Sequence, residues 1–554
     1  MASLNPHTGT LGRRLAAHLL RRTTFGYTRT EIDTFAAMSA DQAVDVLMQM
    51  PAIPPDPQDP TTGLSWLPAG HTTGNSENED LKFIVNSWWL HHVMDPALPL
   101  TIAHKLFFFL HTSFVTSFRD IEWNENHYYT LRLLMEYLEG SYKELAMKIC
   151  LDNGMNDFLD ISESVAGNPN ENFVREFFEL FTIGKGPGAG DGDYTTFTEQ
   201  DVIEAARLMT GFRLNNNWDD LSMQDPDTAL PRARLDVSRH DTTDKMFSPR
   251  FQNQIILGQN TQAGMLQEVQ EFVDMIFNQA ATAQYIVRRL YRFFVRYEIN
   301  QEVETDIILP LAQTLQTLNY ELVPILKLLL KSEHFYDEDD SDAGDEVIGA
   351  LIKSPLDLQL GIMKYFGVPI PDPAADLFHA YVTFYQFGIQ AAQTEACFDL
   401  FAPPEVAGYQ PFYQAPEFNR LWISAKSIPA RYAFADEHMD GPAHLQFDIM
   451  AFITDSNNIS DFQGPDMLGN PGPHPGARIP LHLVSELVDY LLPESISGDR
   501  LDYFYNEVLL EQLPVEDWLY EWDDYVSTGI DTNVKRQIKR LIRAILQSPE
   551  YQLS

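Results

Sequence analysis

The sequence predicts an all-α protein, mainly helical, with long ordered loops and at most a small β-hairpin. Apolar residues recur at i, i+3, i+4 and i+7 through most of the 554 residues, which is the period of an amphipathic helix. Strand candidates are few and short. With 44% hydrophobic and 12% aromatic residues, the chain has enough apolar material for a large core.

The helical period marks segments along the whole chain. An amphipathic helix with Leu15, Leu19 and Leu20 on one side opens it. The same period predicts further helices over residues 31–48, 81–94, 102–109, 128–138, 171–181, 199–210, 265–279, 283–297, 307–330, 481–492 and 533–547. The tail 513–525 (LPVEDWLYEWDDY) alternates aromatics with acids and predicts a packed terminal helix.

Loops and one strand pair interrupt these helices. Residues 254–257 (QIIL) are a strand candidate, and they predict an edge hairpin with residues 245–247. Residues 52–78 and 455–478 are rich in Pro, Gly, Asp and Asn or Thr, which is typical of loops. Residues 184–194 (GKGPGAGDGDY) are too rich in glycine for a helix and predict a flexible turn.

An acidic segment divides the chain. Residues 336–346 (YDEDDSDAGDE) contain seven acidic residues in eleven positions, as expected for a solvated linker. We therefore expect an N-terminal helical region over 1–335, an acidic linker or loop over 336–347, and a C-terminal helical region over 348–554. The second region either folds by itself or packs with the first as one unit.

The charge balance excludes some partners. The chain carries 38 Lys plus Arg against 79 Asp plus Glu, a formal charge of −41. Nucleic acid and anionic membranes would be repelled by such a field. No apolar run approaches the ~20 residues of a membrane helix. Two cysteines, Cys150 and Cys397, cannot form a disulfide framework. We see no signal peptide, so the default expectation is a cytoplasmic protein.

A dense polar cluster lies inside an otherwise apolar helix at residues 168–182 (NPNENFVREFFELFT). Its charged residues Glu171, Arg175 and Glu179 follow one another at i+4 on one face. After the glycine loop, a second helix starts with a pattern like a capping box and carries Glu204 and Arg207.

At these segments the chain resembles the bacterial "domain of unknown function 1800" family. The resemblance rests on NPNENFVREFFELFTIGKG, on YTTFTEQDVIEAARLMTGF, and on Arg239-His240-Asp241 with Lys245. Shorter matches, in the right order, are AAHLLRRTTFG, FFFLHTSFVTS, RRLYRFFV, IKSPLD and PPEVAGY. The resemblance implies a helical fold, one family unit across the acidic segment, and no established activity. It also implies a partner, because genes of the family often lie beside genes for a sulfatase- or phosphatase-like protein.

The chain departs from the family pattern in two respects. Many relatives carry His-Asn-His where this chain has His111-Thr112-Ser113, so the second histidine of that motif is missing. This difference weakens the case for a shared metal site based on histidine. Many relatives are also exported, whereas no signal is seen here.

The polar cluster suggests a hydrolytic site as one hypothesis. His240 would be the general base and Asp241 its orienting partner, with Glu176 and Glu179 as acids or metal ligands. Three cations beside them would bind an anionic substrate: Arg175, Arg207 and Lys245. The alternative is a structural network in which the same charges satisfy one another.

A divalent metal ion is a second hypothesis, with His111, Glu176 and His240 as candidate ligands. No His-x-x-x-His, Glu-x-x-His or Cys-x-x-Cys pair is present, so the strong zinc and di-iron signatures are missing. A metal site would have to be assembled by tertiary folding.

The strip 285–297 (YIVRRLYRFFVRY) reverses the local sign of charge, because it carries arginines and no acid. Arg288, Arg292 and Arg296 align at i+4, and Arg292 is our candidate for binding an anion such as phosphate, sulfate or a carboxylate. The alternative is that these arginines pair with acids of a neighbouring helix.

Two functions agree with these observations. The favoured one is a soluble accessory or binding protein that works with a partner protein. The alternative is a metal- or His/Glu-dependent hydrolase acting on an anionic substrate. No cofactor is defined beyond a candidate divalent metal ion.

Overall fold

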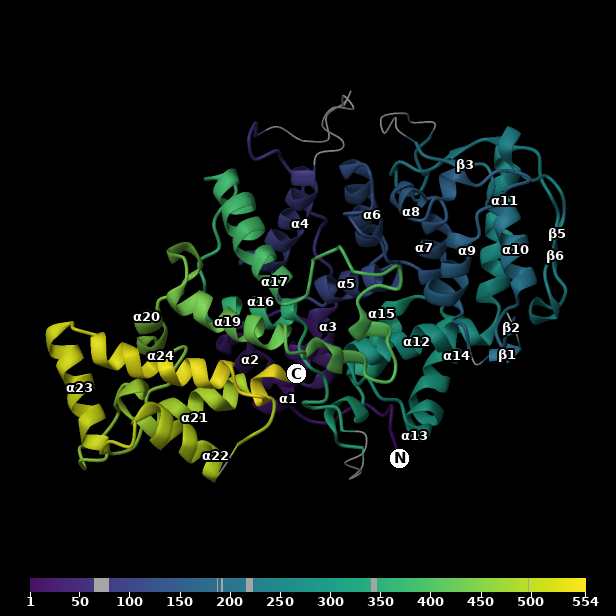
Figure 1. Ribbon diagram of the computed structural model, residues 1–554. Coiled ribbons are helices and arrows are strands. Elements are labelled where there is room, and N and C mark those ends of the chain that lie inside the picture. The colour runs from purple at the N-terminus through teal and green to yellow at the C-terminus, as the bar shows by residue number, and fades with distance from the viewer. Residues whose placement is uncertain (64–78, 187, 191–192, 216–222, 340–345, 497) are drawn as a thin grey trace.

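Helices account for most of the described chain, and the prediction of a mainly helical protein is confirmed (Figure 1). The computed structural model describes residues 1–63, 79–186, 188–190, 193–215, 223–339, 346–496 and 498–554. Strands within these ranges form three two-stranded antiparallel sheets.

The helices of the N-terminal region are α1 (Gly12–Thr23), α2 (Arg29–Ala36), α3 (Ala40–Leu47), α4 (Glu79–Met94), α5 (Ala103–Ser113), α6 (Asn124–Glu136), α7 (Tyr142–Ile149), α8 (Asn153–Phe158), α9 (Asn172–Glu176), α10 (Glu199–Leu208), α11 (Gln262–Phe277), α12 (Ala280–Phe294), α13 (Gln301–Val303), α14 (Leu309–Thr317) and α15 (Leu322–Leu330). Its strands are β1 (Gly188–Gly190), β2 (Asp193–Tyr194), β3 (Phe212–Arg213), β4 (Arg234–Leu235), β5 (Lys245–Met246) and β6 (Ile255–Ile256). The C-terminal region contains α16 (Pro355–Phe366), α17 (Ala391–Glu395), α18 (Gln410–Tyr413), α19 (Ser427–Asp440), α20 (Ile449–Thr454), α21 (Pro480–Leu491), α22 (Asp499–Asp502), α23 (Val515–Thr528) and α24 (Thr532–Leu546).

Two of the predicted long helices are each broken in the structure. Residues 31–48 form α2 and α3, because Ser39 and Gln42 build a new capping box in the middle of the segment. Residues 307–330 contain α14 and α15, separated by a turn at which Asn319 and Tyr320 adopt φ values of 48° and 63°. Apolar periodicity continues across both breaks, so the period alone did not reveal them.

The predicted hairpin is confirmed. Strand β5 pairs with β6 in antiparallel register, with Lys245 opposite Ile256 and Met246 opposite Ile255. Lys245 points inward and is fully buried, whereas Met246 and Ile255 are exposed on the outer face. The pairs β1–β2 and β3–β4 were not predicted. The first of them lies in the glycine loop, of which residues 187, 191 and 192 lie outside the described residues.

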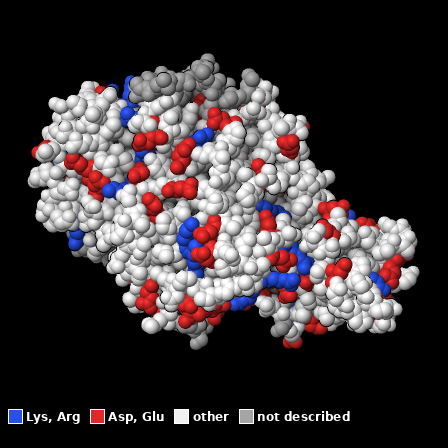
Figure 2. All heavy atoms as spheres, turned by 180° about the vertical axis from the view of Figure 1, so that it is seen from behind, with Lys and Arg blue, Asp and Glu red and all other residues white. Residues whose placement is uncertain are grey.

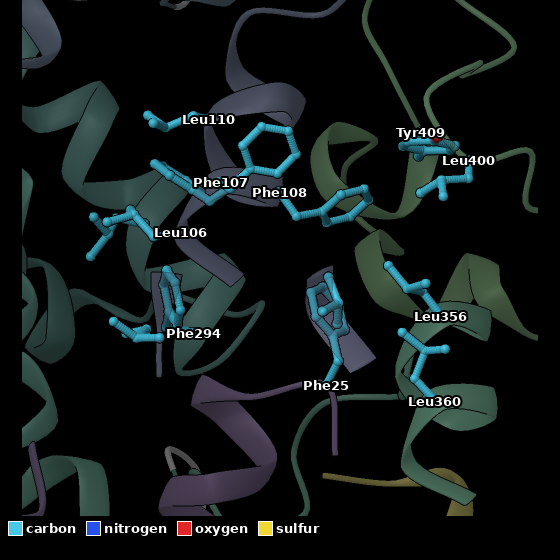
Figure 3. Packing of buried hydrophobic residues seen from close by; sticks show 14 of the residues in the cluster. Phe25, Leu106, Phe107, Phe108, Leu110, Phe294, Leu356, Leu360, Leu400 and Tyr409 are labelled. Atoms are coloured by element: carbon cyan, nitrogen blue, oxygen red, sulfur yellow. The ribbon is translucent and has the colours of Figure 1, made fainter. Parts of the chain in front are cut away.

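A single cluster of buried hydrophobic residues runs through both regions, from Ala2 to Tyr551. Figure 3 shows part of it, where Phe25 and Phe108 lie near Leu356 and Tyr409. The boundary at the acidic segment stays a prediction, since residues 340–345 lie outside the described residues.

The C-terminal helices lie far from the strand pairs. Helices α20 to α24 gather at one end, and the strand pairs lie at the opposite side (Figure 1). A π-helical stretch, His379–Gln390, runs directly into α17 and packs against α4.

Figure 2 shows carboxylates and cations interspersed over the rear face. The surplus of acid on that face is therefore distributed, with no large patch of a single sign.

Candidate functional sites

Arg175 joins the starts of two helices. Its Nη2 lies 2.6 Å from Oε1 of Glu199, and its Nη1 lies 3.1 Å from the other oxygen of that carboxylate. Nη2 also lies 3.0 Å from Oε2 of Glu171. The hydrogen bonds from Arg175 lower the pKa of Glu199. This two-pronged pairing fastens α9 to the first turn of α10, and it does not involve Glu176.

The two glutamates predicted as acids or metal ligands have different surroundings. Glu176 is half-buried, and burial together with the charge of Glu179 raises its pKa. Glu179 accepts a hydrogen bond of 2.7 Å from Nζ of Lys185, and that ammonium lies 4.8 Å from the centre of the Tyr194 ring. The helix changes from α to π winding between them, at Phe177.

Arg207 and Asp241, which were predicted to bind an anion and to orient His240, form an ion pair with each other. Nε of Arg207 lies 3.0 Å from Oδ2 of Asp241, and its Nη1 lies 2.5 Å from Oε2 of Glu204. Burial opposes ionisation of Asp241, but the hydrogen bonds from Arg207 and Thr243 outweigh it and lower the pKa to about 2. Asp241 therefore holds the loop before β5 to α10 and does not orient the imidazole of His240.

His240 lies in a closed network with Glu268 and Lys245. Its Nδ1 lies 2.8 Å from the carbonyl oxygen of Thr210, and its Nε2 lies 3.0 Å from Oε1 of Glu268. The other carboxylate oxygen of Glu268 lies 2.5 Å from Nζ of Lys245. The three side chains are 0%, 1% and 0% exposed. Both ring nitrogens face fixed acceptors, so no side of His240 is open to a substrate.

Glu268 is the member of this network that sequence reasoning missed. It lies on α11 among Met265, Val269 and Phe272, which are all buried. A carboxylate on an apolar helix face must find a partner, because an unpaired buried charge is costly. The position of Glu268 on the apolar face of α11 was therefore a signal in the sequence. It predicts a buried cation or histidine nearby.

His111 lies apart from the other candidate metal ligands. It stacks on Phe108 at an interplanar angle of 12° and lies 4.9 Å from the centre of the Phe401 ring. Burial lowers its pKa to about 3, so it is a neutral core histidine. Among the described residues, no group of three or more His, Cys, Asp or Glu side chains is placed to hold a metal ion. The geometry therefore gives no support to the predicted metal site.

The arginines of the strip 285–297 diverge. Arg288 pairs with Glu304, with Nη2 lying 2.5 Å from Oε1. Arg296 lies beside Glu298 and donates to a backbone carbonyl. Arg292 donates to the carbonyl of Tyr297 at 3.2 Å and lines a cavity between the two regions. Three cations missed by sequence reasoning line the same cavity: Arg21, Arg22 and Lys105. The signal for the first two was their place in AAHLLRRTTFG, a segment of the family resemblance.

An open groove lies between α17 and α19 on the C-terminal region. Its free volume is about 580 Å³. One wall comes from the end of the π-helical stretch and α17, and the other comes from α19. Its uncharged lining residues, here called the floor, are small or apolar, namely Phe387, Gly388, Ala391, Ala392, Ala430, Ala433, Phe434 and Gly441. Its charged lining residues are all acidic: Glu395, Asp436, Glu437 and Asp440.

The described helices include none that is both long and apolar enough to cross a membrane. The fold and these sites define a helical protein with a closed polar network, an open acidic groove and an internal cationic cavity. The family model described as "Protein of unknown function (DUF1800)" matches residues 18–553. The chain belongs to this family. No curated protein matches it, and no solved structure does.

Proposed function

We propose that this protein works by binding a partner protein, and that the groove between α17 and α19 receives a helix of that partner with basic side chains. The groove carries this proposal, because its small and apolar lining residues lie beside four carboxylates, here called the rim. The partner that the family resemblance implies is a sulfatase- or phosphatase-like protein of the kind encoded beside many relatives.

The floor of the groove suits a helix. The small side chains of Ala391, Ala430 and Ala433 would let the backbone of a helix come close, as in recognition of amphipathic helices by apolar grooves. Phe387 lines the groove, and 68% of its surface is exposed. A large exposed aromatic ring beside small residues is a typical anchor for a binding partner.

The charge of the rim selects a basic occupant. Asp436 and Asp440 are already shared with Arg543 of α24. Among the described residues, neither Glu395 nor Glu437 has an ion-pair partner. Burial raises the pKa of Glu437 to about 7, so a lysine or arginine from a partner would relieve an unfavourable charge.

The hydrolase alternative has less support. It needs His240 open to a substrate and Asp241 beside it. Instead His240 is enclosed between Thr210 and Glu268, and Asp241 pairs with Arg207. These polar residues hold α10, the β5–β6 hairpin and α11 together instead.

The test uses a labelled synthetic helix of about 18 residues with Leu and Ala on one face and Lys on the other. Fluorescence anisotropy would measure its affinity for the wild type and for Phe387→Asp. We expect at least a tenfold weaker affinity for the variant, because the anchor is lost. Tyr520→Asp, at a ring 71% exposed on α23, is the matched control and should bind as the wild type does.

Two results would contradict the proposal. One is equal binding by the wild type and by Phe387→Asp. The other is equal affinity for a control peptide in which every Lys is replaced by Glu, since the acidic rim should reject it.

A further inference from the structure

We propose that the cavity lined by Arg21, Arg22, Lys105 and Arg292 binds a dianionic oxyanion, a phosphate or sulfate group. The cavity lies where α1, α5 and α12 of the N-terminal region meet α16 and α18 of the C-terminal region. It is distinct from the groove, and this inference goes beyond the proposed function.

The cations of this cavity are deeply buried. Arg21, Arg22 and Lys105 are only 5%, 3% and 6% exposed, in a protein whose net charge is −41. Four cationic side chains line the cavity, against the side-chain carboxylate of Asp357 and the main-chain carboxylate of Ser554, the last residue of the given sequence. Buried charges in proteins are ordinarily paired. The surplus of positive charge therefore needs an explanation.

Internal partners neutralise this charge only in part. Lys105 forms an ion pair with Asp357, and Asp357 is also held by the hydroxyl of Ser354 at 2.7 Å. Arg21 donates to two backbone carbonyls, at 2.8 and 3.0 Å, and Arg22 donates to the carbonyl of Val347. Within the described residues, neither arginine has a carboxylate at ion-pair distance, and the charges of Asp337 and Asp357 act on Arg22 only from farther away. A carbonyl dipole satisfies a donor but supplies no counter-charge.

Several donors in the cavity also lack a hydrogen-bond partner among the described residues. Nε of Arg21 and both Nε and Nη1 of Arg22 are buried without a hydrogen bond. Asn419 lines the cavity, is 7% exposed, and has neither side-chain atom bonded. Unsatisfied buried donors are rare. These donors belong to side chains that an oxyanion would satisfy together.

More cations lie directly behind the cavity. Lys353 donates to the carbonyl of Tyr551 at 2.7 Å, and Arg431 donates to the carbonyl of Lys353 at 2.9 Å. Lys353, Arg21 and Asp357 line an adjoining pocket. Burial lowers the pKa of Lys353, and the charges of Arg21 and Arg431 lower it further. An anion beside Arg21 would relieve the repulsion within the whole cluster.

The size and walls of the cavity indicate the ligand. Its free volume is about 40 Å³, where one water-sized group needs about 10–15 Å³, so it holds a compact group of a few atoms. Phe25 and Phe108 form an apolar wall, with ring centres 6.2 Å apart (Figure 3). Arginine forks match the oxygens of phosphate and sulfate. The surplus of more than one positive charge favours a dianion over a monoanion.

The test is thermal unfolding of the full chain in sodium sulfate or sodium phosphate at about 5 mM, against sodium chloride of equal ionic strength. At this concentration the general exclusion effect of sulfate is small. We expect both dianions to raise the melting temperature by at least about 2 °C more than chloride does. Sodium acetate of equal ionic strength should behave as chloride does.

The melting temperature of Arg22→Met, measured with and without sulfate, separates a binding site from a structural role. Arg22→Met removes a buried, unpaired charge with little change in length, so its melting temperature without dianions should equal or exceed that of the wild type. The same variant should lose the shift caused by sulfate. Arg536→Met, at an exposed arginine paired with Glu511, is the matched control and should keep the shift. Arg292→Gln, at the half-buried rim, should at least halve it.

Two outcomes would overturn the inference, and a further ligand identifies the source of the anion. Equal shifts with sulfate and chloride in the wild type would overturn the inference, and so would an undiminished sulfate shift in Arg292→Gln. This second variant decides the matter if Arg22→Met does not fold. Methyl phosphate distinguishes the sources of the anion. A shift equal to that of phosphate indicates the end group of an ester, and a shift with inorganic phosphate alone indicates the free ion.

Discussion

Nε2 of His240 lies 3.0 Å from Oε1 of Glu268, and both side chains are fully buried. The contact joins the loop before β5 to the middle of α11. Lys245 neutralises the same carboxylate from the hairpin itself. The histidine that resembles a catalytic base in the sequence is thus one part of a three-residue network between elements that are far apart in the chain.

Loss of the carboxylate should destabilise the fold strongly. Glu268→Gln leaves Lys245 buried without a counter-charge and removes an acceptor from His240. We expect the free energy of unfolding to fall by about 3–5 kcal/mol, measured by denaturant unfolding. Glu271→Gln, at a half-buried residue of the same helix whose carboxylate accepts only from Gln267 among the described residues, is the control and should change stability by less than about 0.5 kcal/mol. Equal effects of the two substitutions would contradict the role of the network.

Gly211 should tolerate no side chain. It has a φ of 83°, and a Cβ there would lie 2.7 Å from the carbonyl oxygen of Asp236 and 3.1 Å from Cβ of His240. Gly211→Ala therefore combines backbone strain of about 1 kcal/mol with a clash. Gly529→Ala, at φ 73° with open space around it, has the strain alone. Denaturant unfolding should show the larger loss for Gly211→Ala, and similar losses would contradict the crowding at His240.

Glu437 should make stability depend on pH. Burial raises its pKa to about 7, whereas an unfolded chain titrates near about 4.3. Between these values the folded protein holds the extra proton, so stability from this group is present at low pH and is lost as the pH rises through about 7. Unfolding measured at about pH 5 and pH 8 should show a smaller difference for Glu437→Gln than for the wild type. Glu395→Gln, at an exposed residue of the same groove, should leave the difference unchanged.

Glu176→Gln should not harm the fold. Burial and the neighbouring charge of Glu179 raise the pKa of Glu176, so its ionised form is unfavourable in the folded protein. Replacement by the neutral amide should leave the melting temperature at neutral pH equal to or above that of the wild type. A large fall in melting temperature would show that Glu176 has a stabilising partner. It would contradict the conclusion that the ionised form of Glu176 is unfavourable.

Much of the fold could be predicted from residue patterns. The hairpin of Lys245–Met246 with Ile255–Ile256 was recognised because two short β-prone runs lie close together in sequence. The breaks before Ala40 and at Asn319 were missed, because apolar periodicity reports which side faces the core and not where backbone hydrogen bonds stop. Capping residues such as Ser39 hold that second kind of information.

The site was harder to predict, because ion pairs depend on tertiary distance. Asp241 follows His240 directly in sequence, yet its carboxylate belongs to Arg207. Arg21 and Arg292 are more than two hundred positions apart and line one cavity. Sequence periodicity reveals neither of these contacts. It does reveal Glu268, because this carboxylate falls on the buried face of α11.

The affinity of one peptide for three proteins tests whether the groove between α17 and α19 is the binding site. The Lys-faced helix would be titrated into the wild type, Phe387→Asp and Glu268→Gln at a temperature at which all three are folded. The proposed function predicts at least tenfold weaker binding by Phe387→Asp and binding within about twofold of the wild type by Glu268→Gln. The opposite pattern, with binding kept by Phe387→Asp and lost by folded Glu268→Gln, would contradict it and would place the function at the His240 network.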